Sequence, residues 1–423
     1  MPLTGEYIKT FTTQSIEAIY KHKFSSATSL KMLLKGEDSF KTIFDAVRTA
    51  GRLICLEFYI FRNDETGAEL ADILKQKSRE GVKVYLLYDH FGSFGTPVSF
   101  WKDMKAAGVN IRASHPFKWI APFHYVHRDH KKLIVIDEKK AFTGGINIAN
   151  EYSGFHLRLK ERNWRDTGIM LEGPIVNELM MIFKKSWYAW GGEIIDDTEL
   201  KTGPERSRTG ERKRKDVNTS PSLRSPVPKS SPVLLSGSPV TAIPAIPIFV
   251  SSAKGRRRMR RLLYYSINHS QESISLTTAY FTPSRRMVET LENAVKRGVK
   301  VRLLAPGISD VPAAAYAGRA FFSRLLRAGI EIYRYSGEIL HAKTFLFDEC
   351  WGIIGSTNLD FQSLRYNDEG NVGILDSDFA SKMNDIFEED LRRSARIDEE
   401  QWKRRPLCQK IREYFFSFLR RRL

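Results

Sequence analysis

Short hydrophobic runs alternate along the chain with longer stretches in which hydrophobic residues recur at helical spacing. The runs predict buried strands, and the stretches between them predict helices. Strand segments in the first part of the chain have counterparts, in the same order, in the last part. The matching segments are 53–61 and 273–281, 82–90 and 299–307, and 106–111 and 327–332. This order predicts an internal repeat of roughly 150 residues.

The alternation of strands and helices is typical of an α/β fold in which helices cover sheets. We therefore predict two similar half-domains, each a mixed sheet flanked by helices, packed about a pseudo-twofold axis. The segment between them is rich in Ser, Pro, Arg and Lys and has too few apolar residues to offset the entropy cost of ordering, so we expect a flexible linker. The expected boundaries are an N-terminal segment 1–29, a first half-domain 30–200, the linker 201–242, a second half-domain 243–400 and a basic amphipathic C-terminal helix 401–423.

One motif occurs once in each half of the repeat, and the two copies have identical internal spacing. A single His-x-Lys pair on a strand is usually an ordinary surface or core-edge pair. Two copies that lie 211 residues apart and share their glycine and asparagine tails indicate one active site built at the seam of two halves. The copies are His130-x-Lys132-x4-Asp137 followed by Gly144-Gly145-x-Asn147, and His341-x-Lys343-x4-Asp348 followed by Gly355-Ser356-x-Asn358.

Side chains alternate between the two faces of a strand. If residues 130–137 form an unbroken strand, His130 and Lys132 project to one side and Asp137 to the other. The second copy has the same parity. The histidine and lysine of each copy are therefore expected to share a pocket, whereas each aspartate is expected to be structural. The small residue pair that follows lets backbone approach closely and leaves Asn147 and Asn358 free to reach a ligand.

Two histidines, two lysines and two asparagines form a cationic, donor-rich site that suits a tetrahedral phosphate. One histidine can attack phosphorus while the other transfers the proton of the leaving or incoming oxygen. Asp166 and Glu369, which follow the first and second copies, are expected to orient one histidine each. Arg128 is a further candidate for phosphate binding. No cluster of ligand residues has a spacing that demands a metal, and we predict neither a metal nor a cofactor.

The net charge of +18 is concentrated in short segments, which suit an anionic polymer or an anionic membrane surface. They are 201–231, with nine Lys or Arg against three acidic residues, 254–261, with six and none, and 402–423, with eight and one. No apolar run is long enough to span a membrane, and the first residues lack the core of a signal peptide. Cys55, Cys350 and Cys408 are too far apart to outline a disulfide framework or a zinc site, and we expect a reducing, cytoplasmic setting.

The final segment predicts an amphipathic helix with charge around one apolar face. Such a helix can lie in the interface of an anionic bilayer, or its apolar stripe can pack on the core of the protein. The pattern leaves both alternatives open. The stripe consists of Leu407, Ile411, Tyr414, Phe415, Phe418 and Leu419, and the basic residues are Lys410, Arg412 and Arg420 to Arg422.

The doubled motif resembles the signature of the phospholipase D superfamily. Within it, the chain is most similar to bacterial cardiolipin synthases, in a short form without N-terminal transmembrane helices. The stretches that carry this similarity include VHRDHKKLIVIDEKKAFTGGINIANEY, NWRDTGIMLEGP and LHAKTFLFDECWGIIGSTNLDFQSLRYNDEGNV. The resemblance implies two phospholipase D-like half-domains with a catalytic set of His130, Lys132, Asp137, His341, Lys343 and Asp348.

The resemblance also implies a metal-independent transfer through a phospho-histidine, with His130 as the nucleophile and His341 as the acid and base. The expected reaction makes cardiolipin from two phosphatidylglycerol molecules and releases glycerol. Hydrolysis of phospholipid to phosphatidic acid is the alternative. A nuclease is less favoured, because nucleases with this motif are often single-copy chains, and intact His and Lys in both copies argue against an inactive phosphate-binding scaffold. We expect a peripheral protein on the cytoplasmic face of the bacterial membrane, held by its basic segments and C-terminal helix.

Overall fold

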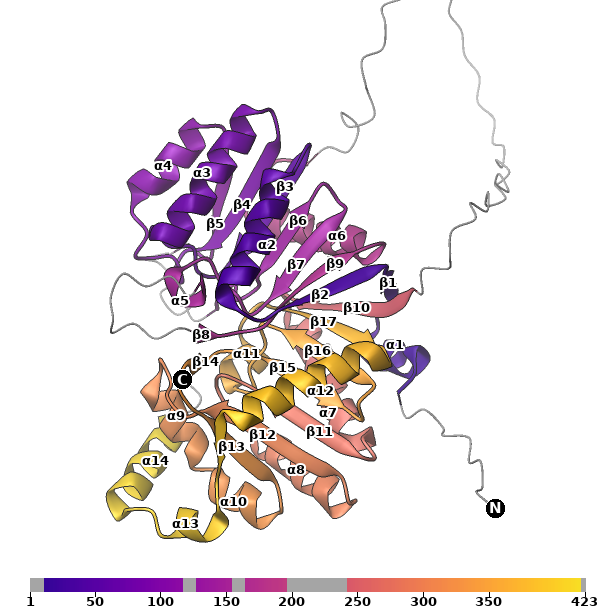
Figure 1. Cartoon of the computed structure of the whole chain (residues 1–423), viewed down its shortest axis with the longest axis vertical. Helices are drawn as coiled ribbons and strands as arrows, with labels where there is room; N and C mark the ends of the chain where they lie inside the picture. Colours follow the sequence, from indigo (N-terminus) through magenta and orange to yellow (C-terminus); the bar gives the residue numbers. More distant parts are fainter. Residues whose placement is uncertain (1–10, 117–126, 154–163, 196–241, 420–423) are drawn as a thin grey trace, which may run out of the picture. The chain divides into compact units, whose positions relative to one another are not determined.

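A computed structural model of the chain describes residues 11–116, 127–153, 164–195 and 242–419 (Figure 1). The described residues up to Gly192 and those from Ala242 onward belong to one compact unit. Except for residue 242, the predicted linker lies outside the described residues, and so do residues 1–10 and 420–423. The domain boundaries predicted from the sequence therefore remain a prediction.

The first sheet is mixed, and helices cover both of its faces. Its β3, β4 and β5 pair in parallel, and its other neighbours pair antiparallel. Hydrophobic residues of α2 (Gly36–Arg48), α3 (Glu65–Arg79) and α4 (Val98–Ala106) pack on one face, and α6 (Ile175–Ala189) contacts the other. In spatial order its strands are β2 (Ser29–Leu33), β9 (Gly168–Glu172), β7 (Lys140–Gly144), β6 (Leu133–Ile136), β3 (Leu53–Phe58), β4 (Lys83–Asp89) and β5 (Asn110–Ser114).

The second sheet repeats this order and adds one strand at each edge. Its strands are β1 (Ser25–Ala27), β10 (Ile243–Val250), β17 (Glu369–Leu375), β16 (Trp351–Gly355), β15 (Thr344–Phe347), β11 (Ser273–Thr277), β12 (Lys300–Pro306), β13 (Glu331–Tyr335) and β18 (Ser394–Arg396). The helices α7 (Ala253–His269), α8 (Arg285–Lys296) and α10 (Phe322–Arg327) cover one face, and α12 (Ser377–Arg392) covers the other. The predicted fold of two similar α/β halves is thus confirmed.

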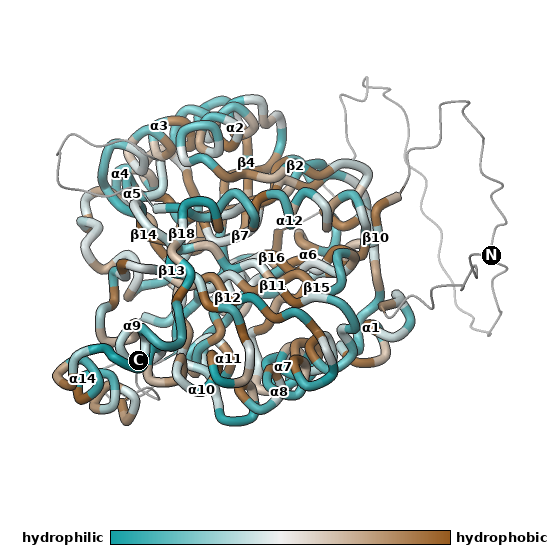
Figure 2. The backbone as a smooth tube through the Cα atoms, turned by 60° about the horizontal axis from the view of Figure 1, so that its bottom comes forward, coloured by the Kyte–Doolittle hydropathy of each residue, from teal (hydrophilic) through white to brown (hydrophobic). Residues whose placement is uncertain are grey.

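Hydrophobic residues concentrate on the strands in the interior, and polar residues are frequent along the helices that cover them (Figure 2). This distribution follows from the sequence, because strands that are covered on both faces must be apolar along most of their length. β3 is buried at every position, and so is β16.

The two halves exchange chain segments. The N-terminal helix α1 (Thr13–Tyr20) packs on α7, and β1 forms an edge of the second sheet although β2, a few residues later, belongs to the first. β7 and β9 contact β16 and β17, so the two sheets meet directly. The short β8 (Trp164–Arg165) pairs in parallel with β14 (Ile339–Leu340), which ties the segment after one motif to the segment before the other.

The remaining described helices are short or lie at the edges of the second half. They are α5 (Asn150–Ser153), α9 (Pro312–Arg319), α11 (Phe361–Arg365), α13 (Glu399–Lys403) and α14 (Leu407–Leu419). No helix in the described part of the chain is long and apolar enough to span a bilayer.

Candidate active site

The two motif aspartates close turns at the ends of strands. Asp137 and Asp348 have φ values of 51° and 48°, in the left-handed region that aspartate tolerates better than most residues. The Asp137 carboxylate accepts backbone N–H bonds from Gly51, Arg52 and Leu53 at 2.8–2.9 Å. The Asp348 carboxylate accepts backbone N–H bonds from Gln271, Glu272 and Ser273 at 2.9–3.1 Å.

This placement corrects the inclusion of Asp137 and Asp348 in the catalytic set. Both carboxylates hold the first residues of a neighbouring strand, β3 or β11, and neither residue lines the cavity that contains the histidines. This placement agrees with the prediction from side-chain alternation that each aspartate faces away from the histidine and lysine of its motif.

The motif strand is shorter than expected. We predicted an unbroken strand over 130–137, but β6 begins at Leu133 and β15 begins at Thr344. The side chains before β6 still alternate. Lys131 turns away from its neighbours and pairs with Glu57 at 2.6 Å, whereas Lys132 Nζ donates to the His130 carbonyl oxygen at 2.7 Å. His130 and Lys132 are thus brought together even without regular strand pairing.

Each histidine is held by a carboxylate from the opposite half. His130 Nδ1 lies 3.1 Å from Glu369 Oε2, and His341 Nδ1 lies 2.6 Å from Asp166 Oδ2. Backbone hydrogen bonds also join each histidine to the opposite half. His130 N–H donates to the Asp368 carbonyl, and His341 N–H donates to the Arg165 carbonyl, both at 2.8 Å. From the sequence, one carboxylate was expected for each histidine, and the pairing was open. The structure shows that the pairing is crossed.

The Gly-Gly and Gly-Ser pairs explain how the two carboxylates fit. A Cβ atom on Gly145 would lie 2.0 Å from Asp166 Oδ1, so this glycine leaves the room that Asp166 occupies. In the second copy, Ser356 stands at the equivalent position, and its hydroxyl donates to Glu369. The first copy thus has glycine beside the carboxylate of Asp166, and the second has serine beside the carboxylate of Glu369.

Burial and clustered charge set the protonation of the first histidine and its partner. Burial, together with Lys132 and Lys343, holds the pKa of His130 well below its usual range. Burial and the charge of Lys343 lower the pKa of Lys132 to about 7. Burial raises the pKa of Glu369 to about 7, although Lys132 and the Ser356 hydroxyl oppose this shift. The free site therefore favours a neutral imidazole at His130.

The second histidine differs in its carboxylate. Burial would raise the pKa of Asp166, but Lys343 and His341 outweigh it and hold that pKa below its usual range. Burial and Lys343 lower the pKa of His341, while Asp166 opposes the shift. Lys343 Nζ lies 2.6 Å from His341 Nδ1 and donates to the His341 carbonyl oxygen. His341 thus faces an ionised carboxylate, which can stabilise a proton on the ring when a negative charge arrives.

Both histidines line a cavity of about 610 Å³. Lys132 and Lys343 are not among its lining residues. They lie buried beside the histidines, so their charges act from behind the cavity wall. The predicted shared pocket thus has histidines at its surface and lysines beneath it. No group of His, Cys, Asp or Glu within the described ranges is arranged to hold a metal ion.

The predicted phosphate ligands line the same cavity, but two of them also tether loops. The carboxamide oxygen of Asn147 accepts the Ile60 N–H at 3.1 Å, and that of Asn358 accepts the Tyr280 N–H at 3.2 Å. Asn147 also donates to the Tyr152 hydroxyl. Arg128 lies over the Phe91 ring, 3.9 Å from its centroid, which leaves its guanidinium at the cavity wall.

Aromatic and acidic residues that the sequence did not reveal as part of the site also line the cavity. Trp164 lies 4.7 Å from the His341 ring and Tyr59 lies 4.9 Å from the His130 ring, measured between centroids. These contacts restrict how the imidazoles can turn. Closeness to the motifs could have identified some of these residues, since Trp164 precedes Asp166 by two positions and Asp360 follows Asn358 by two. The missed wall residues are Tyr59, Tyr152, Trp164, Tyr280, Asp310 and Asp360.

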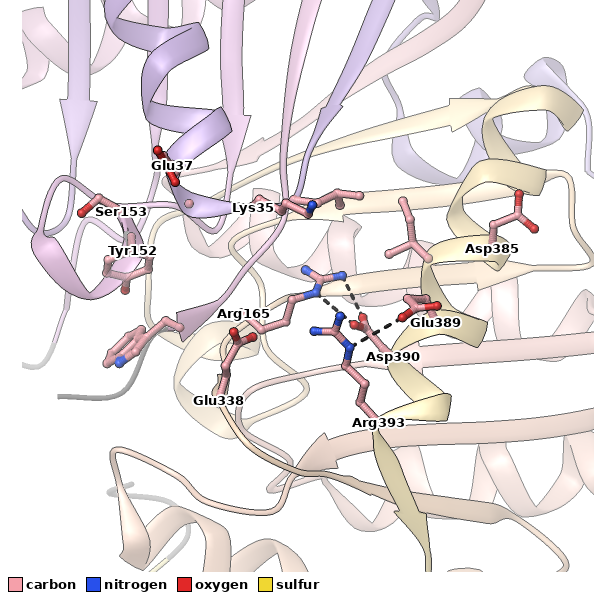
Figure 3. A pocket seen from close by; sticks show the side chains of 14 residues that line it. Lys35, Glu37, Tyr152, Ser153, Arg165, Glu338, Asp385, Glu389, Asp390 and Arg393 are labelled. Atoms are coloured by element: carbon pink, nitrogen blue, oxygen red, sulfur yellow. Dashed lines mark hydrogen bonds and ion pairs between the residues drawn. The ribbon is translucent and has the colours of Figure 1, made fainter. Parts of the chain in front are cut away.

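A second cavity, of about 520 Å³, shares Tyr152 and Trp164 with the first and is lined by neither motif histidine (Figure 3). Arg165 crosses it to form a two-point ion pair with Asp390 of α12, at 3.0 and 2.8 Å, and Arg393 lies beside this pair and contacts Glu389. Because the Arg165 carbonyl holds His341 and the next residue is Asp166, this buried pair anchors the seam. The Arg165–Asp390 pair therefore supports the contact between the two halves.

Comparison with known proteins places these features in a family. A family model described as "Cardiolipin synthase, PLD-like domain" matches residues 43–187 and 263–391, which include both motifs and both carboxylates. The cardiolipin synthase of Geobacillus kaustophilus is 32% identical over 396 residues, which cover 93% of this chain and 72% of the relative. A probable cardiolipin synthase of Bacillus subtilis is 31% identical over 406 residues, 96% of this chain and 74% of the relative.

Solved structures share the fold at lower identity. The phosphatidylserine synthase of Haemophilus influenzae has a TM-score of 0.68 at 13% identity, covering 97% of this chain and 100% of that one. The polyphosphate kinase of Porphyromonas gingivalis has a TM-score of 0.55 at 15% identity, covering 95% of this chain and 52% of that one. At such identities the likeness concerns the fold alone.

Proposed function

Because this chain belongs to the cardiolipin synthase family with a phospholipase D-like domain, we propose that it is a phosphatidyltransferase that makes cardiolipin from two phosphatidylglycerol molecules and releases glycerol. The observation that carries the proposal is the crossed pair of histidines in one cavity. Each imidazole is oriented by a buried carboxylate from the other half. Such a pair offers a nucleophile and a proton-transfer group on opposite sides of one phosphate.

In the first step, the lone pair of His130 Nε2 attacks phosphorus, and the bond from phosphorus to the glycerol headgroup breaks. The depressed pKa of His130 keeps this nitrogen unprotonated, and Glu369 accepts the Nδ1 proton to fix the tautomer. His341 donates the proton that the leaving glycerol oxygen needs. The negative charge of the bound phosphodiester and the ionised Asp166 both favour that proton on His341.

In the second step, the hydroxyl of another phosphatidylglycerol attacks the phospho-histidine. His341 takes its proton, the bond between phosphorus and His130 breaks, and both histidines return to their starting states. Lys132 and Lys343 offset the negative charge on the phosphoryl oxygens, so we propose that the transfer needs no metal ion.

The test is to incubate the purified chain with phosphatidylglycerol vesicles in the presence of a chelator and to analyse the products. Cardiolipin and glycerol in equal amounts are expected. Phosphatidic acid without cardiolipin would replace the transferase with a hydrolase. Cleavage of nucleic acid without lipid turnover would overturn both lipid reactions.

We expect a narrow, bell-shaped pH dependence of kcat/KM centred near pH 7. Below it, protonation of Glu369 (pKa about 7) removes the negative charge that holds the Nδ1 proton of His130. Above it, deprotonation of Lys132 (pKa about 7) removes a charge that stabilises the phosphoryl group. Each limb should approach a fall of about tenfold per pH unit, and the two values belong to a coupled pair.

A Lys132→Arg variant tests the assignment of the alkaline limb. Arginine keeps its charge throughout the accessible range, so this limb should move to higher pH while the acidic limb stays. A profile that is flat between pH 6 and 8 in the parent chain, or an alkaline limb that the substitution leaves in place, would contradict the assignment.

We further propose that α14 attaches the protein to anionic membranes. The opposite face of the helix holds it to the protein, through the buried ion pair of Glu413 with Arg405 and the stacking of Phe416 on Tyr316 of α9. The apolar stripe does not pack on the core, so the core-packing alternative is wrong for these side chains. Leu407, Ile411, Tyr414, Phe415, Phe418 and Leu419 are 38–71% exposed. α9, on which α14 packs, directly follows Asp310 and Val311 of the cavity wall.

An Ile411→Asp variant should weaken co-sedimentation with phosphatidylglycerol-containing vesicles by about 10- to 100-fold, since burying such a side chain in an apolar phase is worth about 1.5–3 kcal/mol. Met181→Asp in α6 is the matched control, because Met181 is 55% exposed and Ile411 is 59% exposed. The control should bind like the parent chain. Equal binding by all three proteins, with unchanged circular dichroism, would exclude α14 as the membrane contact.

A further inference from the structure

A groove that gathers six arginines lies next to the active site. It has a volume of about 1130 Å³ and is formed by α1, α7, α8 and α11. The basic segment 254–261, which the proposed reaction does not use, supplies part of one wall as the first turns of α7. Asp360 is the one acidic residue among the described residues of its lining. The cationic side chains are Lys21, Arg257, Arg260, Arg261, Arg285, Arg286 and Arg365.

The charges of these arginines are the next feature of the groove. In the described part of the chain, none of the six forms an ion pair with a carboxylate. Arg256, one position before the groove residue Arg257, does pair with Asp368, at 3.1 Å. Burial, together with the charges of Arg365 and Arg257, lowers the pKa of Arg260. The groove thus gathers like charges whose mutual repulsion a bound anion would relieve.

A helix N-terminus and two aromatic rings hold some of the arginines of the groove in place. Helix α8 begins at the groove with Arg285 and Arg286, and its first turn contains no acidic residue. Cations at a helix N-terminus oppose the helix dipole, whereas an anion there is favourable. Arg286 lies over the Tyr264 ring at 4.8 Å and Arg365 over the Phe361 ring at 5.0 Å. Stacked guanidinium groups are pre-oriented, which reduces the entropy lost on binding.

The wall that separates the groove from the active site is one short helix. Gln362 and Ser363 of α11 line the cavity of the histidines, whereas Phe361, Leu364 and Arg365 line the groove. Asp360, directly before α11, lines both. A ligand in the groove would therefore lie one helix away from the reacting phosphate.

We propose that the arginine groove binds a second phosphate-bearing anion, which in the working enzyme is the headgroup of an anionic phospholipid other than the one being transferred. Clustered arginines recognise phosphate oxygens through paired N–H donors, and several stacked guanidinium groups suit such a headgroup better than a single lysine would. The lipid source rests on the proposed function, because an enzyme that joins two anionic lipids works on a surface rich in them. The phosphate chemistry rests on the groove alone.

The test uses the His130→Ala chain, so that lipid is not consumed, and isothermal titration with monomeric dihexanoyl-phosphatidylglycerol. We compare it with the same chain carrying Arg257→Glu, Arg261→Glu and Arg365→Glu. The control chain carries Arg79→Glu, Lys102→Glu and Lys382→Glu, three exposed positions away from the groove. The groove variant should lose one bound equivalent, or bind it at least about tenfold more weakly, and the control should not.

The outcomes separate the possible ligands. If glycerol phosphate gives the same groove-dependent equivalent, the groove recognises the phosphate group alone, and if only the short lipid does, the acyl chains contribute. Unchanged stoichiometry and affinity in the groove variant overturn the proposal. So does an oligonucleotide that binds in a groove-dependent way when the lipid does not. Because the titration measures binding without turnover, its result is independent of whether the chain makes cardiolipin.

Discussion

A His130→Ala variant is expected to lose cardiolipin synthesis by on the order of a millionfold in kcat, because it lacks the imidazole that carries the covalent intermediate in the proposed mechanism. His341→Ala should lose a comparable factor, and the double variant should be little worse than either one. This non-additivity follows from the proposed mechanism, since the attack by one imidazole is productive only if the other protonates the leaving oxygen. The measurement is the initial rate of cardiolipin formation from radiolabelled phosphatidylglycerol.

The same variants identify the nucleophile. Rapid quenching at alkaline pH should trap a labelled phospho-histidine in the parent chain and none in His130→Ala. An adduct that persists in His130→Ala would move the attack to His341. His127→Gln is the control, because His127 lies near the first motif and does not line the reaction cavity. It should retain most of the activity and form the adduct normally.

Removing the charge of either orienting carboxylate is expected to cost about 10⁴-fold in kcat, by analogy with the loss of a buried aspartate that fixes a catalytic tautomer. The substitutions are Asp166→Asn and Glu369→Gln, which keep the shape and the capacity to accept a hydrogen bond. With the natural lipid the two variants should look alike, because both disturb a histidine that the reaction needs.

The crossed geometry predicts that a phosphatidyl ester of p-nitrophenol separates the two variants. Its leaving group departs without a proton, so the first step no longer needs His341 as an acid. The burst of nitrophenol should therefore be restored in Asp166→Asn, whose partner is His341, and remain slow in Glu369→Gln, whose partner is the nucleophile His130. His341→Ala should behave like Asp166→Asn in this assay. Restoration in Glu369→Gln alone would show that the working pairs are the reverse of those in the structure.

The crossed pairing has a physical basis in how the two halves meet. Glu369 begins β17 and Asp166 follows β8, and both segments lie at the contact between the halves. The Arg165–Asp390 pair and the hydrogen bonds from the histidine N–H groups fix that contact. One half alone therefore contains a histidine whose orienting carboxylate belongs to the other half. Both halves, each with its own copy of the motif, are thus needed to complete the two histidine–carboxylate pairs.

Several expectations held because they depended on local chemistry. The α/β fold followed from the alternation of strands and helices, and the repeated strand order from the matched segments. Parity along the motif separated His130 and Lys132 from Asp137 even though the strand proved shorter, because an extended chain alternates its side chains with or without a pairing partner. The sequence likewise predicted the apolar stripe of α14, but it did not decide whether other parts of the protein cover that stripe.

The motif histidines, lysines and asparagines, their spacing and the phosphate chemistry they suit could be predicted from the sequence, since each is a property of a few neighbouring positions. The tertiary structure alone decided which carboxylate holds which histidine, because His130 and Glu369 are 239 positions apart and His341 and Asp166 are 175 apart. It also decided that the lysines lie behind the cavity, that the stripe of α14 is exposed and that the arginines of α7, α8 and α11 share one groove. Each of these depends on the packing of segments that are distant in the chain, which local pattern does not encode.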